Sequence, residues 1–255
     1  MRNEQNIFDN VAFFDGYKLL RENAMSANDV EEKPALFQLI PDLAGKKVLD
    51  LGCGYGENCK KYSEMGASYV LGIDISEKML EIAKQTNNCA GVEYRRMDME
   101  DIDSIPTKFD VVVSSLALHY IMNFDALIRK ISDLLNDNGY LVFTQEHPIA
   151  TAPVGGMLWK QNGEYFEGLL LTDYASEGRR EVTWFVDGVV KFHRKTETIL
   201  NTLIDHGFAV TKVLEPTVSE EIIQKEKQLS RCRHAPDYLM VRARKLPRQY
   251  RDLLK

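Results

Sequence analysis

A run of alternating glycines follows an acid in the stretch VLDLGCGYGE, residues 48–57. In order, the run contains Asp50, Gly52, Gly54 and Gly56. Because glycine loses much conformational entropy on folding, such a run indicates a tight turn or a ligand in contact with the main chain. A dinucleotide-binding turn has the spacing G-x-G-x-x-G, and Glu57 occupies its third glycine position here. A carboxylate at a helix start disfavours a pyrophosphate, so we expect a ligand without phosphates; a purely structural turn is the alternative.

A second acid, Asp74, ends the next apolar segment, LGIDIS. A carboxylate can accept two hydrogen bonds, which suits the two adjacent hydroxyls of a ribose. Taken alone, Asp74 could also be an acid at the start of a helix. Together with the glycine turn it favours a nucleoside ligand.

Two histidines are candidates for acid–base chemistry. His119 lies in LALHYI and His147 lies in TQEHPI, after the fourth and fifth predicted strands. Histidine titrates near neutral pH, so either could take a proton from a substrate. The alternative is that each is a structural residue of a pocket wall. A metal site that combines both with Glu146 is disfavoured, and we expect no metal.

Tyr17 and Arg21 are spaced i, i+4 in the helical N-terminal segment, so they share one face. A guanidinium forks well onto a carboxylate, so Arg21 could bind a carboxylate of the ligand. An ordinary surface arginine is an equally good explanation.

The elements that must position these residues are short apolar strands alternating with amphipathic helices. Strands are predicted at 46–51, 69–73, 92–97, 109–114 and 140–145, and helices at 57–65, 77–85, 124–135 and 195–206. The alternation predicts an α/β fold, a parallel sheet covered on both faces. The stretch NDNG predicts a turn after the third of these helices. Strands at 208–216 and 237–245 follow, and the last is expected to pair antiparallel with its neighbour.

Two regions fall outside this alternation. Residues 1–40 precede the first strand and are expected to form a helical cover over the core, 41–255. Residues 148–192 interrupt the core and contain both tryptophans. Ligands of such sheets bind outside the carboxyl ends of the strands, so this insert could be a lid over a pocket. A satellite hydrophobic cluster under a long loop is the alternative.

These motifs together resemble the class I S-adenosylmethionine-dependent methyltransferases. The resemblance covers residues 46–145 well and the last two strands loosely. It implies a three-layer Rossmann-like sheet of seven strands in the order 3-2-1-4-5-7-6, with strand 7 antiparallel. It also implies S-adenosylmethionine as cofactor and S-adenosylhomocysteine as product. The glycine turn would lie under the methionine part, and Asp74 would hold the ribose.

The same resemblance assigns further cofactor contacts. Asp98 would accept from the adenine amino group, Met99 would offer its backbone N–H to the ring, and Ile75 and Met79 would flank it. Ser114 would offer its carbonyl to the methionine ammonium. Without the resemblance, Met79 is a helix core residue and Asp98 belongs to a solvated acidic run. Many relatives close their site with an N-terminal helical cover, which supports a place for Tyr17 and Arg21 beside the cofactor.

Composition limits the partners. The 255-residue chain has a formal net charge of −6, so nucleic acid is disfavoured, and its basic stretch at 231–234 is explained by a solvated strand edge. Its four cysteines form no CxxC pair, which fits reduced thiols. The N-terminus lacks an apolar leader and no stretch suits a membrane helix, so we expect a cytoplasmic protein.

The expected activity is methyl transfer to a small, partly apolar or aromatic molecule. Methylation of RNA or protein is one alternative, although SSLALHY stands where relatives that methylate base amino groups have N/D-P-P-Y/F. A non-catalytic module that binds the cofactor or its product is another. A nucleotide-dependent oxidoreductase is disfavoured by the glycine spacing. The oligomeric state and the atom that receives the methyl group are left open.

Overall fold

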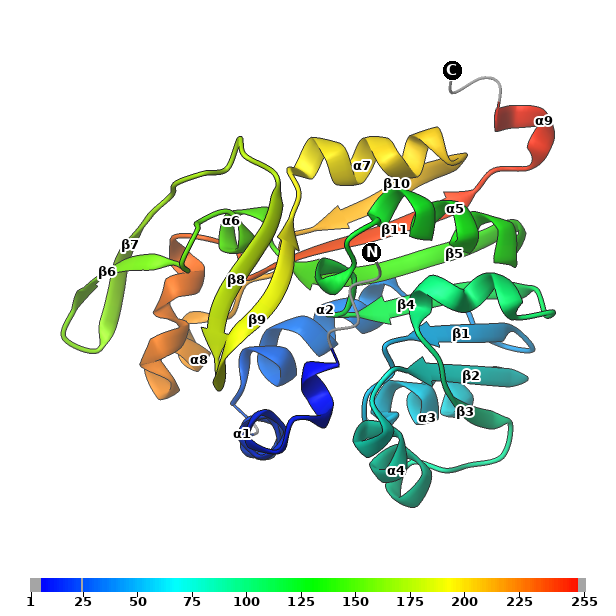
Figure 1. The fold of residues 1–255 in the computed structure, drawn as a ribbon, viewed down its shortest axis with the longest axis horizontal. Coiled ribbons are helices and arrows are strands. Elements are labelled where there is room, and N and C mark those ends of the chain that lie inside the picture. Colours follow the sequence, from blue (N-terminus) through cyan, green and yellow to red (C-terminus); the bar gives the residue numbers. More distant parts are fainter. Residues whose placement is uncertain (1–5, 24, 252–255) are drawn as a thin grey trace.

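A seven-stranded sheet forms the centre of the molecule, with helices on both faces (Figure 1). The structure is a computed structural model and describes residues 6–23 and 25–251. The strands of the sheet are β1 (Lys47–Leu51), β2 (Tyr69–Asp74), β3 (Val92–Arg96), β4 (Phe109–Ser115), β5 (Leu135–Glu146), β10 (Phe208–Leu214) and β11 (Tyr238–Lys245). The spatial order is β3-β2-β1-β4-β5-β11-β10, and β11 pairs antiparallel with both neighbours. This confirms the predicted fold and strand order.

Alternate residues of each central strand feed two separate cores, as the period of two in a strand requires. Leu49 and Leu51 of β1 join the core under α5 (Phe124–Leu134) and α7 (Thr196–Asp205). Val48 joins the other core, under α2 (Lys33–Leu39), α3 (Glu57–Glu64) and α4 (Glu77–Thr86). The sheet is therefore buried on both faces, and only its strand ends are free to form a site.

Local signals position the helices next to these strand ends. The side chain of Ser76 accepts from the backbone N–H of Met79 and caps α4, as its place in the sequence predicts. Helix α3 begins directly after Gly56, which has a left-handed backbone conformation. Both helices therefore start at the carboxyl edge of the sheet.

Two sequence predictions are corrected. Residues 136–139 do not form a free turn after α5, because β5 begins at Leu135 and includes Asn138 with a φ of 66°. The basic stretch 231–234 is not a strand edge. Residues 231–233 end the 3-10 helix η5 (Lys227–Arg233), where Arg231 pairs with Asp237. The basic charge there is neutralised locally.

The N-terminal segment is helical where the structure describes it. It contains η1 (Ile7–Asp9), α1 (Val11–Glu22), the π-helical turn η2 (Asn28–Glu32) and α2. Residues 1–5 and 24 of the expected cover, and 252–255 of the expected core, lie outside the described residues. No helix in the described part of the chain is both long and apolar enough to cross a bilayer.

The insert after β5 consists of a short helix and two hairpins. These are α6 (Pro148–Thr151), β6 (Leu158–Asn162) with β7 (Tyr165–Leu170), and β8 (Gly178–Trp184) with β9 (Val186–His193). The β8–β9 hairpin lies across the carboxyl ends of the central strands, next to α1 (Figure 1). The Phe13 ring of α1 lies edge-on to Trp184 at 5.2 Å and to Phe185 at 5.6 Å. Other helices of the described residues are η3 (Met99–Ser104), η4 (Leu118–Tyr120), α8 (Glu220–Lys225) and α9 (Arg248–Arg251).

Candidate functional site

A cavity of about 690 Å³ lies at the carboxyl edge of the sheet. Its wall comes from two sets of residues. One set lies at the ends of β1, β2 and β3 and in the segments that follow them. It is called the turn end: Asp50, Gly52, Gly54, Asp74, Ile75, Met79, Asp98 and Met99. The other set is called the hairpin end: His119, Tyr120, Glu146, Arg180, Trp184 and Lys191. Tyr17 and Arg21 of α1 also line the cavity.

The three glycines of the turn have left-handed φ values of 73°, 52° and 75°. A Cβ at Gly52 would lie 2.7 Å from Cβ of Ala117, and a Cβ at Gly56 would lie 2.3 Å from the hydroxyl of Tyr94. A Cβ at Gly54 would meet nothing within 4 Å, although this residue lines the cavity. Protein packing therefore explains the first and third glycines, while the second keeps space free inside the cavity.

Asp50 connects β1 to the helix that follows the glycine turn. It is buried at the end of β1, and its Oδ2 accepts a hydrogen bond from Sγ of Cys59 at 3.2 Å. Burial raises the pKa of Asp50 to about 7, although the bond from Cys59 opposes this shift. Asp50 thus connects the end of β1 to α3 and also lines the cavity.

Asp74 connects the glycine turn to the start of α4. Its Oδ2 accepts from the backbone N–H of Gly54 at 2.9 Å, and its Oδ1 accepts from that of Ser76 at 2.8 Å. Burial raises the pKa of Asp74 to about 6, and these two bonds oppose the shift. Each carboxylate oxygen keeps a second lone pair, so the group can still accept from a diol in the cavity.

The residues predicted to surround an adenine lie together on the cavity wall. Ile75, Met79, Asp98 and Met99 all line it, at the ends of β2 and β3. Asp98 begins the 3-10 helix η3 (Met99–Ser104), and its Oδ1 accepts from the backbone N–H of Glu100 at 2.8 Å. This bond explains the place of Asp98 without a ligand, and its second oxygen stays available to one.

Ser114 is not among the cavity-lining residues. It is buried, and its hydroxyl donates to the carbonyl of Leu51 at 2.9 Å, which joins β4 to β1. The three residues that follow, Ser115 to Ala117, line the cavity instead, and Leu116 has a φ of 53°. The side chain of Ser114 thus serves the sheet, and the predicted contact of its backbone carbonyl with the ligand stays a prediction.

The two predicted residues of α1 line the cavity, and Arg21 already forms polar contacts with other residues of the protein. The guanidinium of Arg21 pairs with Glu57 and donates to Asn28. Glu57 also pairs with Lys33 at 2.7 Å. Tyr17 is half-buried, and desolvation raises the pKa of its hydroxyl to about 12, so the hydroxyl is protonated at neutral pH. The structure thus brings both residues to the site and gives Arg21 a carboxylate partner from the protein.

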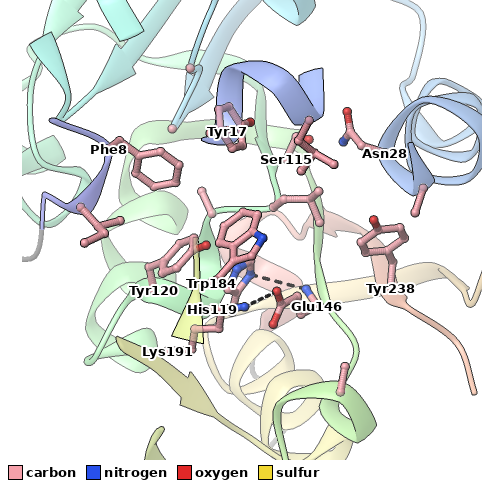
Figure 2. A pocket seen from close by; sticks show the side chains of 18 of the residues that line it. Phe8, Tyr17, Asn28, Ser115, His119, Tyr120, Glu146, Trp184, Lys191 and Tyr238 are labelled. Carbon is pink, nitrogen blue, oxygen red and sulfur yellow. Dashed lines mark hydrogen bonds and ion pairs between the residues drawn. The ribbon is translucent and has the colours of Figure 1, made fainter. Parts of the chain in front are cut away.

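The two histidines differ in position. His119 lines the cavity beside Tyr120, and its Nδ1 accepts from the backbone N–H of Glu146 at 3.4 Å (Figure 2). His147 is not among the lining residues. Its Nδ1 accepts from the backbone N–H of Ile149 at 3.1 Å, and its Nε2 lies 2.9 Å from Glu215. Both nitrogens of His147 are therefore occupied, and it caps α6.

Burial lowers the pKa of His119 to about 4, so its ring is neutral near pH 7. Because Nδ1 accepts a hydrogen bond, the ring proton is carried by Nε2. In this protonation state His119 carries a hydrogen-bond donor at Nε2. It is a weak base.

Several residues of the hairpin end are absent from the sequence predictions. The side chain of Lys191 pairs with Glu146, and its ammonium lies 5.2 Å from the ring centre of Trp184 (Figure 2). Burial raises the pKa of Glu146, but this ammonium outweighs burial and the net shift is downward. The signal that could have found them is the alternation of residues along 178–193, which predicts a hairpin with one inward face.

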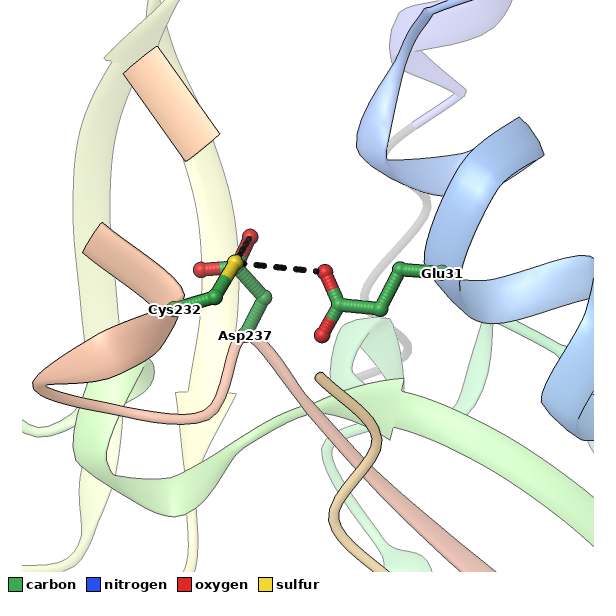
Figure 3. Close-up of side chains that lie close together, drawn as sticks. All are labelled: Glu31, Cys232 and Asp237. Atoms are coloured by element: carbon green, nitrogen blue, oxygen red, sulfur yellow. Dashed lines mark hydrogen bonds between the residues drawn. The ribbon is translucent and has the colours of Figure 1, made fainter. Parts of the chain in front are cut away.

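A second group of ligating side chains includes Asp237, which also lines the cavity (Figure 3). Glu31, Cys232 and Asp237 present atoms within 4.8 Å of one another. The thiol of Cys232 donates to Glu31 at 3.5 Å, and Arg231 forks onto Asp237 with contacts of 2.7 to 3.1 Å. Burial raises the pKa of Glu31 to about 8 and also raises that of the Cys232 thiol. A protonated thiol and a guanidinium-bound carboxylate are poor cation ligands, so we assign this group to hydrogen bonding.

Comparison with known proteins agrees with the fold and the turn. A family model described as a methyltransferase domain matches residues 49–143. The crystal structure of an S-adenosylmethionine-dependent methyltransferase from Mesorhizobium loti is 38% identical in sequence. It superposes with a TM-score of 0.77 and covers 86% of this chain and 98% of that chain.

Two sequence relatives extend this comparison. An uncharacterized protein of Haemophilus influenzae is 39% identical over 253 residues, which is 96% of this chain and 99% of the relative. A ubiquinone biosynthesis O-methyltransferase of Neisseria meningitidis is 36% identical over 107 residues, 40% of this chain and 45% of the relative. The likeness to the second relative is thus confined to less than half of each chain.

The sheet and the turn define a class I S-adenosylmethionine-dependent methyltransferase fold, and the extended match at 38% identity agrees. The chain belongs to the S-adenosylmethionine-dependent methyltransferases. Its cofactor is S-adenosylmethionine. The free space above Gly54 and the acid at Asp74 fit this group, because a bare main chain and a diol acceptor stand beside one cavity.

Proposed function

We propose that this methyltransferase acts on a small, partly aromatic molecule held at the hairpin end of the cavity. The observation that carries this proposal is the composition of the wall, where Phe8, Tyr17, Tyr120 and Trp184 gather around one cavity (Figure 2). Phe8 lies edge-on to Tyr17 at 5.6 Å and to Tyr120 at 5.9 Å. Such walls favour flat apolar ligands with few polar groups.

The cofactor is proposed to occupy the turn end. Gly54 leaves the main chain open to its methionine part, with Gly52 beside it in the same turn, and Asp74 accepts from the ribose. Ile75, Met79, Asp98 and Met99 surround the adenine. Tyr17 and Arg21 close this end from α1. The bound cofactor supplies an activated methyl group, so the protein mainly orients the acceptor and excludes water. The expected helical cover 1–40 and insert 148–192 would serve that exclusion.

His119 is proposed to orient the acceptor through Nε2–H, since His147 is occupied at both nitrogens. A general base contributes about 10² to 10⁴ in rate, whereas an orienting hydrogen bond contributes about tenfold. We therefore expect His119→Gln to lower kcat/KM by about tenfold. A loss above about a hundredfold, with a pH profile that disappears in the variant, would restore the base assignment.

The experiment that tests the proposed function is a screen of small aromatic acceptors with methyl-labelled S-adenosylmethionine. Transfer of label to a small molecule with saturation kinetics is the expected result. Transfer only to RNA or protein in the same assay would contradict the small-molecule assignment. Trp184→Ala should raise KM for the acceptor found and leave the affinity for S-adenosylhomocysteine unchanged.

A further inference from the structure

The β8–β9 hairpin carries two cations on the side that lines the cavity. Arg180 and Lys191 stand directly opposite each other in the antiparallel pairing, and both line the cavity. Their exposed fractions are 6% and 8%. Like charges opposite each other in a sheet are destabilising, and burial adds a desolvation cost to each. Such a pair is stabilised by anions placed close to it.

The charge of Lys191 is balanced within the protein. Its ammonium pairs with the carboxylate of Glu146 and lies over the ring of Trp184. Glu146 ends β5, so the compensating charge comes from the core of the sheet. One of the two cations of the hairpin therefore has its counter-ion.

Arg180 is bonded differently. Its Nε donates to the carbonyl of Ala152 at 2.7 Å, and its Nη1 donates to the carbonyl of Arg179 at 3.2 Å. Its Nη2 donates to the carbonyl of Ser176. Among the described residues, no carboxylate lies within ion-pair distance of Arg180. A guanidinium has five N–H donors, so Nη1 and Nη2 each keep one.

The other cations of the cavity wall are paired. Arg21 and Lys33 share Glu57, and Arg231 forks onto Asp237. In the part of the chain that the structure describes, Arg180 is thus the buried cation of the wall without a carboxylate partner. Arg180 also stands opposite a second cation, Lys191. If Arg180 only linked backbone carbonyls, this placement of two like charges would not be needed.

We propose that Arg180 binds a carboxylate of the methyl acceptor, so that the substrate is an aromatic or apolar acid. This inference rests on the proposed function, because it places the acceptor at the hairpin end. The two remaining N–H donors match the two oxygens of a carboxylate, and guanidinium–carboxylate bonds are charge-assisted. Trp184 and Tyr120 would contact the apolar body of the acid.

The test compares an acid with its neutral amide. The protein is saturated with S-adenosylhomocysteine, and binding of 2-naphthoate and 2-naphthamide is measured by calorimetry. We expect the acid to bind at least about tenfold more tightly, the scale for a hydrogen bond to a charged group. Arg180→Gln should remove this preference. The matched control is Arg179→Gln, since Arg179 is exposed and pairs with Glu181, and it should keep the preference.

Equal binding of acid and amide by the unaltered protein would overturn the proposal, as would a preference that survives in Arg180→Gln. Arg180→Lys keeps the charge but loses the bonds to the carbonyls, so a preference kept in this variant supports the charge and not a packing role. Tighter binding of 2-naphthylphosphonate than of 2-naphthoate would contradict the choice of a carboxylate. Failure of the acceptor screen, with this acid preference intact, would instead reject the proposed function.

Discussion

The turn end of the cavity is built from consecutive loops, whereas the hairpin end is assembled from segments far apart in the chain. Residues 50–57, 74–79 and 97–99 each connect the end of a strand to the start of a helix, so a short stretch of sequence sets their conformation. At the hairpin end, His119 comes from the segment after β4, Glu146 from β5 and Lys191 from β9. The family-wide function thus sits on local structure, and the proposed substrate specificity sits on tertiary contacts.

The largest loss of cofactor affinity at the turn end is expected for Gly54→Val. A Cβ there meets no protein atom within 4 Å, so a side chain would enter the space proposed for the methionine part. We expect the affinity for S-adenosylhomocysteine in calorimetry to fall by about 3 kcal/mol, the upper range for overpacking. Gly163→Val is the matched control, since Gly163 has a similar φ of 61° and open space in the β6–β7 turn. Equal affinities of the two variants would contradict the pose.

The next largest effect is expected for Asp74→Ala. Removal of the carboxylate should weaken binding of S-adenosylhomocysteine by about 1.5–3 kcal/mol, because the hydroxyls of the ribose lose a charged acceptor. Calorimetry at neutral pH measures this loss. Asp74→Asn separates the two roles of the residue, since an amide oxygen can still accept from the backbone of Gly54. Unchanged affinity in both variants would refute the ribose assignment.

The raised pKa of Asp74 predicts a pH dependence of the same contact. With a pKa of about 6, the group is ionised above that pH and protonated below it. A protonated carboxyl is the poorer acceptor, so cofactor affinity should fall as the pH is lowered. Between about pH 7.5 and about pH 5 we expect a loss of about 1.4 kcal/mol, which corresponds to one pKa unit. The affinity of Asp74→Asn measured over the same range should change less.

The hairpin end depends on contact between α1 and the β8–β9 hairpin. Phe13 is buried and lies edge-on to Trp184 at 5.2 Å, so the two rings should couple by about 0.5–1.5 kcal/mol. A double-mutant cycle of Phe13→Leu and Trp184→Leu, measured by chemical unfolding, gives this value. Additive losses would indicate that α1 and the hairpin are held independently, and would weaken the expectation of a shared cover.

The smallest effect is expected for Arg21→Met. Arg21 already pairs with Glu57, so we expect it to add little to cofactor binding. Removal of the guanidinium should change the cofactor affinity by less than about 1 kcal/mol, the scale of a partly exposed ion pair. Calorimetry with S-adenosylhomocysteine measures it. A loss of about 1.5–3 kcal/mol would instead support a bond to the carboxylate of the cofactor. Glu57→Gln distinguishes the cases, since it frees Arg21 and should then raise the affinity.

The spacing of apolar residues predicted most of the strands and helices, because each of these elements is short and strongly patterned. The strand order itself came from the family resemblance, and the antiparallel β11 confirms it. At the end of β4 the sequence points to Ser114, whereas Ser115 to Ala117 are the residues that line the cavity. The apolar pattern does not define the residue at which a strand ends, so only the tertiary structure fixes which backbone groups follow β4 at the cavity.

The amino-acid sequence by itself determined the turn end: Asp50, the three glycines and Asp74 are set by local backbone geometry, which needs few distant partners. Only the tertiary structure decided the hairpin end. It placed His119 on the cavity and His147 away from it, and it paired Lys191, which stands opposite Arg180, with Glu146 of β5. The physical reason is that a side chain's charge balance depends on groups many residues away, which become neighbours only after the insert has folded over the sheet.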